Sequence, residues 1–236
     1  MKYLDLIQSG FKGFISDGYA VFTPVVRELN AQTQNELLAY VEAKLKDASN
    51  EMVCAFSNGT RDVYEQVINF TDRNSERVDL PLVIVVDHSN QQIRVYHTTW
   101  PMSGAHMPYP EIIPVGYDLQ HSQQPEVFAL YEKYLAEHDE KILSLFSADM
   151  VVKEASGKRY LHGGHERDAF YRAVLSGALP AEFLPTAVTV SNDQTRVAGE
   201  YLFGGQGRYV AGVGIWYLSQ DGKQIQAVHI HDDADL

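Results

Sequence analysis

Two histidines near the C-terminus are the residues whose type and spacing point most directly to chemistry. His229 and His231 lie in an apolar run that is typical of a β-strand. Because alternate side chains of a strand share a face, Ala227 and the two histidines are expected on one side, with Val228 and Ile230 on the other. Imidazoles transfer protons near neutral pH, and a His-x-His pair on a strand is also a spacing found among metal ligands.

An acidic residue would complete such a site. Glu154 ends another short predicted strand, and an acid with an imidazole suits proton transfer at neutral pH. Joined by Glu154, or by His162 and His165, the His-x-His pair could instead hold zinc or another divalent ion. The plainer interpretation makes Glu154 a solvated residue or an ion-pair partner of Arg159 or Arg167, and the histidine pair a polar strand end. We expect no metal and no cofactor.

The chain contains an internal repeat. Residues 82–100 and 212–231 each hold an apolar strand, a short polar turn and a second strand with a histidine, and their alignment places His97 on His229. A repeat of more than about 100 residues is too long for a solenoid and indicates two copies of one domain.

The repeat defines the expected domains. Four prolines between residues 100 and 114 indicate an extended connector, since proline fixes φ and removes a donor. We expect a degenerate first domain over 1–114, a linker over 115–122 and a second domain over 123–236. The first copy lacks the second histidine and a convincing acid opposite, so its expected role is that of a scaffold.

In the second copy, predicted helices precede an antiparallel meander. A helix is expected to begin near Pro125, an amphipathic segment follows around Ile142, and a further helix covers His165–Ser176. The predicted strands are Thr186–Ser191, Arg196–Phe203, Tyr209–Leu218 and Gln224–His231. This order is typical of an α+β domain in which helices cover one face of a curved sheet.

The first copy is less regular. Residues 32–47 have the periodicity of an amphipathic helix, and strands are expected at 80–87 and 92–99. The stretch Arg61–Phe70 fits either a helix or a strand. Glycines interrupt residues 1–30, which fit no single element.

The composition is that of a folded, acidic protein. The 236 residues carry a formal net charge of −12, and 45% of them are hydrophobic. Strong negative charge argues against nucleic acid as a partner, and no run has the length and apolarity of a signal peptide or a membrane span. We therefore expect a cytoplasmic protein that binds neither nucleic acid nor membrane. Cys54, the single cysteine, allows no intrachain disulfide and is expected to be buried.

Three stretches of the second copy carry a family resemblance: Tyr131–Asp139, Leu143–Glu154 and Gly163–Tyr171, followed by the closing hairpin. In this order they resemble the NTF2-like superfamily, which includes ketosteroid isomerase and the SnoaL-type polyketide cyclases. The resemblance covers 123–236 well and 50–100 more weakly. It implies an α+β fold in two copies, each a cone of helices on a curved antiparallel sheet. Because single domains of this family commonly dimerise through the open sheet face, it also implies an intrachain pseudo-dimer, with a homo-oligomer as a further option.

The resemblance also implies roles for particular residues. Glu154 falls where the isomerase-type members place their general base, and the side of the last strand that holds His229 and His231 lines their cavity. Two imidazoles would then lie opposite Glu154. The position of the isomerases' second acid becomes Gly214, and that of their helix tyrosine falls near Leu130, so steroid isomerisation itself is not expected.

Candidate ligand-binding residues are Tyr134, Tyr201, Trp216 and Arg167. The aromatic residues also fit positions in the core, and the long aliphatic part of Arg167 could instead carry its guanidinium to the surface. We expect a protein that binds a small apolar metabolite. It would be a cofactor-independent isomerase, cyclase or lyase that transfers protons through Glu154 and the histidines, or a non-catalytic ligand-binding or assembly module. A metal-dependent lyase or hydrolase is a third interpretation, and it requires several of the named histidines and carboxylates to converge.

Overall fold

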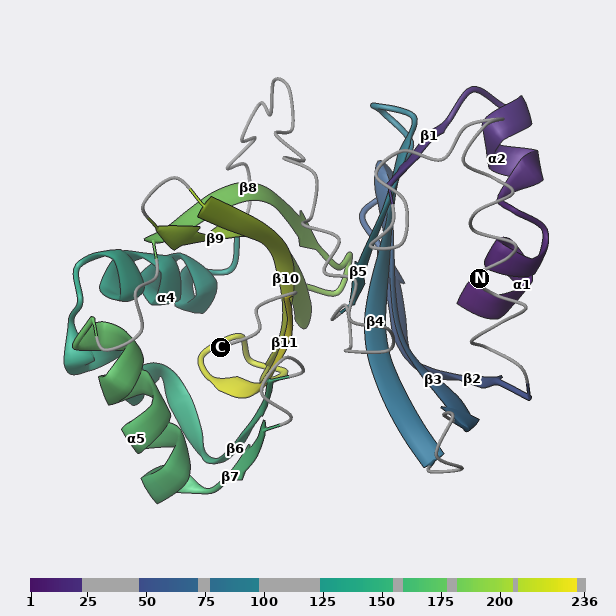
Figure 1. Cartoon of the computed structure of the whole chain (residues 1–236). Coiled ribbons are helices and arrows are strands. Elements are labelled where there is room, and N and C mark those ends of the chain that lie inside the picture. Colours follow the sequence, from purple (N-terminus) through teal and green to yellow (C-terminus); the bar gives the residue numbers. More distant parts are fainter. Residues whose placement is uncertain are drawn as a thin grey trace. The chain divides into compact units, whose positions relative to one another are not determined.

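The computed structural model describes residues 1–22, 47–71, 77–97, 124–154, 159–177, 182–205 and 208–232. The chain divides into two compact units, Met1–Pro110 and Glu111–Leu236, each of which is described by itself (Figure 1). The expected linker 115–122 and nearly all of the helix expected at 32–47 lie outside the described residues.

The first unit is a five-stranded sheet with two short helices packed on one face (Figure 1). Its described elements are α1 (Tyr3–Gln8), α2 (Lys12–Ser16), β1 (Ala20–Phe22), β2 (Ser49–Ser57), β3 (Arg61–Thr71), β4 (Arg77–Asp87) and β5 (Gln92–His97). Tyr3, Ile7 and Phe11 belong to the same buried apolar cluster as Leu82 and Ile84 of β4. The helices therefore cover the apolar face of the sheet.

The second unit is a six-stranded sheet with helices on its concave face (Figure 1). Its described elements are α4 (Glu126–Ala136), the 3-10 helix η1 (Glu140–Leu145), β6 (Phe146–Glu154), β7 (Arg159–His162), α5 (Gly164–Leu175), β8 (Glu182–Val190), β9 (Arg196–Gly205), β10 (Arg208–Leu218) and β11 (Ile225–Asp232). At the start of η1, the side chain of Asp139 accepts a hydrogen bond from the backbone of Lys141, which satisfies one of the donors that a helix leaves free at its beginning.

The two sheets have the same strand order. The first runs β1-β5-β4-β3-β2, and the second runs β7-β6-β11-β10-β9-β8, so they differ among the described strands by the edge strand β7. Each sheet contains one parallel pair among its described strands, β1 with β5 in the first sheet and β6 with β11 in the second. The other described pairs are antiparallel. The predicted α+β class with two copies is confirmed.

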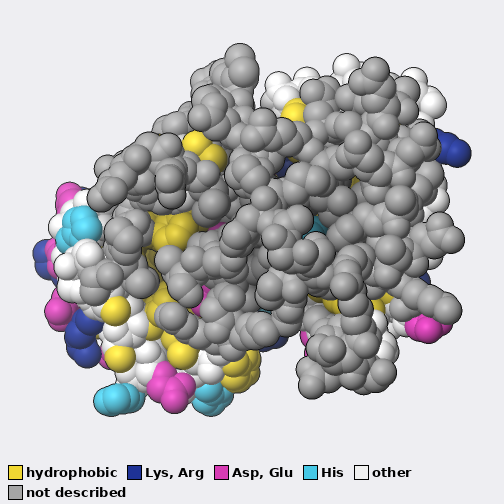
Figure 2. Space-filling model, viewed as in Figure 1, with side chains coloured by type: hydrophobic (Ala, Val, Ile, Leu, Met, Phe, Trp, Pro, Cys, Tyr) yellow, Lys and Arg dark blue, Asp and Glu magenta, His cyan; other side chains and the backbone are white. Residues whose placement is uncertain are grey.

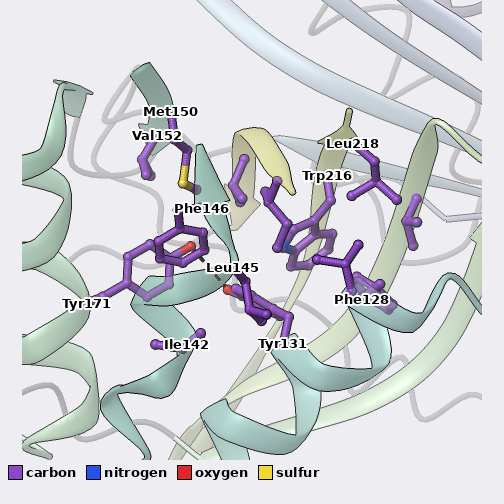
Figure 3. Packing of buried hydrophobic residues seen from close by; sticks show 14 of the residues in the cluster. Phe128, Tyr131, Ile142, Leu145, Phe146, Met150, Val152, Tyr171, Trp216 and Leu218 are labelled. Carbon is purple, nitrogen blue, oxygen red and sulfur yellow. Dashed lines mark hydrogen bonds between the residues drawn. The ribbon is translucent and has the colours of Figure 1, made fainter. Parts of the chain in front are cut away.

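The core of the second unit lies between α4, α5 and the concave face of the sheet (Figure 3). Trp216 of β10 packs edge-on against Phe128 and Tyr131 of α4, with ring centroids 4.9 and 5.3 Å apart. Tyr171 of α5 packs against Phe146 of β6 at 4.6 Å. Such aromatic pairs add to the stability that burial alone provides, so the helices are held firmly on the sheet.

Surface features of the described residues are few. None of the described helices is long and apolar enough to cross a membrane. On the face in Figure 2, the described basic and acidic side chains lie interspersed, and the described basic groups form no continuous patch there. Cys54 is buried and takes part in no disulfide, as expected.

Candidate functional site

The concave face of the second sheet borders a cavity of about 400 Å³. Its lining comes from α4 and the turn after it, from α5, and from strands β8 to β11. The lining residues are Phe128, Tyr131, Glu132, Leu135, Ala136, His138, Phe170, Tyr171, Val174, Phe183, Leu184, Pro185, Val188, Gly199, Glu200, Tyr201, Trp216 and Ile230. A cavity of this size, mostly apolar with a few polar groups, is typical of a small-molecule site.

Three glycines of the sheet beneath the cavity make room for two aromatic rings that line it. An ideal Cβ placed on Gly214 would lie 2.5 Å from Cζ3 of Trp216, and one on Gly199 would lie 2.9 Å from the same atom. A Cβ on Gly212 would lie 2.6 Å from Cε2 of Tyr201. Because real side chains do not approach so closely, the rings of Trp216 and Tyr201 lie against the sheet only where a side chain is missing.

Polar groups gather beside Trp216. The hydroxyls of Tyr131 and Tyr171 are 3.3 Å apart and hydrogen-bonded, and in Figure 3 the indole nitrogen of Trp216 lies on the side of the ring nearest this pair. Nε1 of Trp216 is buried and has no hydrogen-bond acceptor of adequate geometry among the described residues.

Both tyrosines of this pair stay protonated at neutral pH. Burial raises the pKa of Tyr131 to about 12, although the neighbouring Tyr171 hydroxyl and Trp216 indole lower it in part. Burial, together with Tyr131, raises the pKa of Tyr171 well above its ordinary value. Because one of the two O–H hydrogens is used between the tyrosines, the other O–H and the indole N–H are the donors for an oxygen of a bound molecule.

The cavity opens between the end of α4 and the start of β8. Ala136, His138 and Pro185 are exposed there, and Leu184 is 44% exposed. Nδ1 of His138 lies 2.8 Å from the backbone oxygen of Leu175. Since a carbonyl can only accept, Nδ1 carries the hydrogen, and Nε2 is an acceptor in the tautomer that has no second ring hydrogen.

Two of the four predicted ligand-binding residues line the cavity, namely Tyr201 and Trp216. Tyr134 does not line the cavity, although in the sequence it belongs to the same apolar stripe of α4 as Tyr131. It packs at the edge of the core, and the ammonium of Lys141 lies 5.9 Å from its ring centre. Tyr131, one turn earlier, takes the inward position.

Arg167 is buried but is not among the lining residues. Its Nη1 donates to the backbone oxygen of Ser147 at 2.6 Å, and its Nη2 lies 2.7 Å from the carboxylate of Asp168. The guanidinium also stacks over Phe146 at 5.4 Å. Arg167 therefore ties α5 to β6, and it neither lines the cavity nor lies at the surface, contrary to the two expected positions.

His229 and His231 lie on the face of β11 that points away from the cavity, which corrects the expectation that they line it. Ile230 lines the cavity, and Val228 belongs to the core beneath α4. The ring of His229 instead packs on Tyr217 at 4.9 Å. Both histidines are buried on that opposite face.

A β-bulge explains why the two histidines face outward. Ile225 pairs with Leu218 and Ala227 with Tyr217, so Gln226 is an extra residue on its strand. Ile225 is buried in the core, and strict alternation from it would turn Ala227 and both histidines inward. One inserted residue reverses the alternation for the rest of the strand.

Glu154 lies on the cavity side of the sheet. It pairs with Ile230 in the parallel β6–β11 ladder and is 6% exposed, but it is not among the lining residues. Burial, the charge of Asp232 and, more weakly, the charge of Glu154 hold the pKa of Tyr201 well above its ordinary value. Glu154, Asp232 and Tyr201 therefore interact electrostatically, whereas Glu154 and the two histidines face opposite sides of the sheet.

Sequence reasoning missed several of these residues. Asp232 is buried as the last residue of β11, and its alternation with Val228 and Ile230 was a usable signal. Tyr171 and His138 had no signal of their own, because helix packing alone brings them to the cavity. Among the described residues, no three His, Cys, Asp or Glu side chains are grouped so that they could hold a metal ion.

No family model matches the chain, and no curated protein matches it. Solved structures do. A steroid delta-isomerase from Pseudomonas aeruginosa is 17% identical, covers 46% of this chain and 78% of its own, and gives a TM-score of 0.40. An NTF2-like protein of unknown function from Mesorhizobium loti is 16% identical, covers 50% of this chain and 98% of its own, and gives a TM-score of 0.41.

The epoxide hydrolase/cyclase-like enzyme SalBIII, described with pyran ring formation in the polyether salinomycin, is 16% identical, covers 48% of this chain and 93% of its own, and gives a TM-score of 0.40. The resemblance to NTF2-like proteins expected from the sequence is therefore found among solved structures, each of which covers about half of the chain. At these identities and scores, the activities named for those proteins carry no information about this one.

Proposed function

We propose that the second unit binds an apolar small molecule in the cavity beneath α4 and α5. The observation that carries this proposal is the lining of the cavity, which holds about 400 Å³ and is largely aromatic and aliphatic. An apolar lining of this kind gains packing contacts from an apolar molecule of matching size. The glycines beneath Trp216 and Tyr201 favour the same interpretation, because they let both rings lie close to the sheet, where the rings take up less of the cavity.

The polar groups beside Trp216 would orient the bound molecule. The Tyr131 and Tyr171 hydroxyls satisfy each other only in part, because two hydroxyls contain two hydrogens and their shared bond uses one. The remaining hydrogen and the buried N–H of Trp216 favour a ligand oxygen such as a carbonyl, ether or hydroxyl.

Binding is tested with the neutral fluorophore N-phenylnaphthylamine, whose emission rises in apolar surroundings. The wild-type chain is expected to give saturable enhancement. Val188→Trp, which fills part of the cavity, is expected to abolish the enhancement without unfolding the chain. The same change at Val53, which is 40% exposed in the first unit, is the matched control. Equal enhancement in Val188→Trp and the wild type would rule the cavity out as the binding site.

A proton-transfer enzyme is a second candidate, and the burial of Glu154 on the cavity side of the sheet favours it. The base would be Glu154 without the two histidines. The apolar ketone 2-tetralone provides a test, since a base exchanges its acidic C–H hydrogens for deuterium in heavy water. Catalysis predicts exchange faster than in buffer and lost in Glu154→Gln. Equal exchange with and without protein would remove this candidate and leave ligand binding standing.

A further inference from the structure

The described lining of the cavity carries negative charge and no permanent positive charge. The carboxylate on the cavity side is that of Glu132, because Glu200 pairs with Val213 and so shares the face of the sheet that carries His231. The imidazole of the lining is that of His138, and the described lining contains no lysine or arginine. An anionic group entering this cavity would lose its hydration and be repelled by the carboxylate of Glu132, which is unfavourable. A cationic group also loses hydration but is attracted by that carboxylate, and a neutral group avoids both effects.

Glu132 occupies the position from which such a charge acts on a ligand. It lies one helical turn after Phe128 and one turn before Ala136, so these three residues share the side of α4 that borders the cavity. Glu132 is half-buried, whereas Ala136 is exposed at the mouth. The carboxylate therefore lies between the aromatic interior and solvent, where screening by water is reduced.

The described basic side chains of α4, η1 and α5 form contacts elsewhere or are exposed. Lys141 lies 2.9 Å from Asp139, and Arg172 lies 3.6 Å from Glu140. Lys133 follows Glu132 directly on the helix and is exposed. Arg167 is held by Ser147 and Asp168, as described above. None of these described cations lines the cavity.

His138 provides a second acceptor at the mouth. Its Nδ1 donates to the backbone oxygen of Leu175, and Nε2 is an acceptor in the tautomer that has no second ring hydrogen. The interior has the opposite character, because its buried Trp216 N–H is a donor without an acceptor of adequate geometry among the described residues. A complementary molecule therefore carries an acceptor at its inner end and a donor at its outer end.

We infer that the ligand is an apolar molecule with a protonated amine, which Glu132 and His138 hold at the mouth of the cavity while its body lies against Trp216. This inference rests on the proposed ligand-binding function and narrows it to a class of ligand. Both acceptors favour an ammonium group, and the carboxylate of Glu132 discriminates against a matched carboxylic acid.

The test compares phenylbutylamine, phenylbutanol and phenylbutyrate, which share one apolar body, as competitors of N-phenylnaphthylamine at neutral pH. The amine is expected to bind at least about tenfold more tightly than the acid, with the alcohol between them. Glu132→Gln is expected to remove most of this preference. Glu126→Gln, which makes the same charge change at an exposed position at the far end of α4, is expected to retain it.

The outcomes separate this inference from the proposed function. If the fluorophore binds but the amine competes no better than the acid, the inference is overturned and ligand binding stands. A preference for the amine that survives in Glu132→Gln overturns the inference as well. If the fluorophore itself fails to bind the wild-type chain, ligand binding in this cavity fails, and the inference fails with it.

Discussion

Gly214→Ala is the substitution whose effect follows most directly from the geometry of the sheet beneath the cavity. The added Cβ would lie 2.5 Å from Cζ3 of Trp216. The ring cannot withdraw freely, because Phe128 and Tyr131 pack against it with centroids 4.9 and 5.3 Å away. Either the indole moves into the cavity or α4 moves away from the sheet.

The expected cost combines two opposing effects. Overpacking a filled core costs about 1–3 kcal/mol, whereas replacing a strand glycine by alanine recovers roughly 0.5–1 kcal/mol of backbone entropy. The net expectation is a loss of about 1–2 kcal/mol in the free energy of unfolding. Binding of N-phenylnaphthylamine should weaken at the same time, because the displaced indole of Trp216 takes up part of the cavity.

Urea unfolding followed by circular dichroism measures the first effect, and titration with the fluorophore measures the second. Gly13→Ala is the matched control, because a Cβ there meets nothing within 4 Å and the residue lies in helix α2, where alanine is preferred. Its stability should be unchanged or slightly higher. If Gly214→Ala is as stable as Gly13→Ala and binds the fluorophore like the wild type, the packing argument is refuted.

Two further predictions concern buried polar groups. Tyr171→Phe removes the hydrogen bond to Tyr131, 3.3 Å long, and should lower the free energy of unfolding by about 1 kcal/mol; an unchanged urea midpoint would contradict this. In the first unit, burial raises the pKa of Asp87, but hydrogen bonds from Arg61 and Asn90 outweigh it and hold this pKa below 3.8. The stability from Asp87 is therefore present above about pH 4 and lost as the pH falls through the folded-state pKa. Asp87→Asn should cost about 3 kcal/mol at neutral pH and progressively less in acid, so a pH-independent difference in urea midpoint would contradict this assignment.

Local patterns were sufficient for much of the secondary structure. The strands expected at 80–87 and 92–99 correspond to β4 and β5, and His165–Ser176 corresponds to α5. Alternating apolar residues and the turns between them carry this information within a few neighbours. The repeated hairpin likewise indicated two copies, and the shared strand order of the two sheets agrees with it.

Other elements depended on distant partners. Arg61–Phe70 fitted a helix or a strand by periodicity, and pairing with β2 on one side and β4 on the other makes it a strand. A short apolar run has the same local pattern in both conformations, so its hydrogen-bonding neighbours decide between them.

The orientation of the candidate site residues likewise depends partly on local pattern and partly on tertiary structure. The sequence by itself determined that Ala227, His229 and His231 share one face of a strand, because the pleat has a period of two. Only the tertiary structure decided which face that is: the extra residue Gln226 in the bulge reverses the alternation, and α4 covers the side that holds Ile230. A period specifies relative orientation, whereas the side that faces a cavity depends on strand register and helix packing, which bring together residues far apart in the chain.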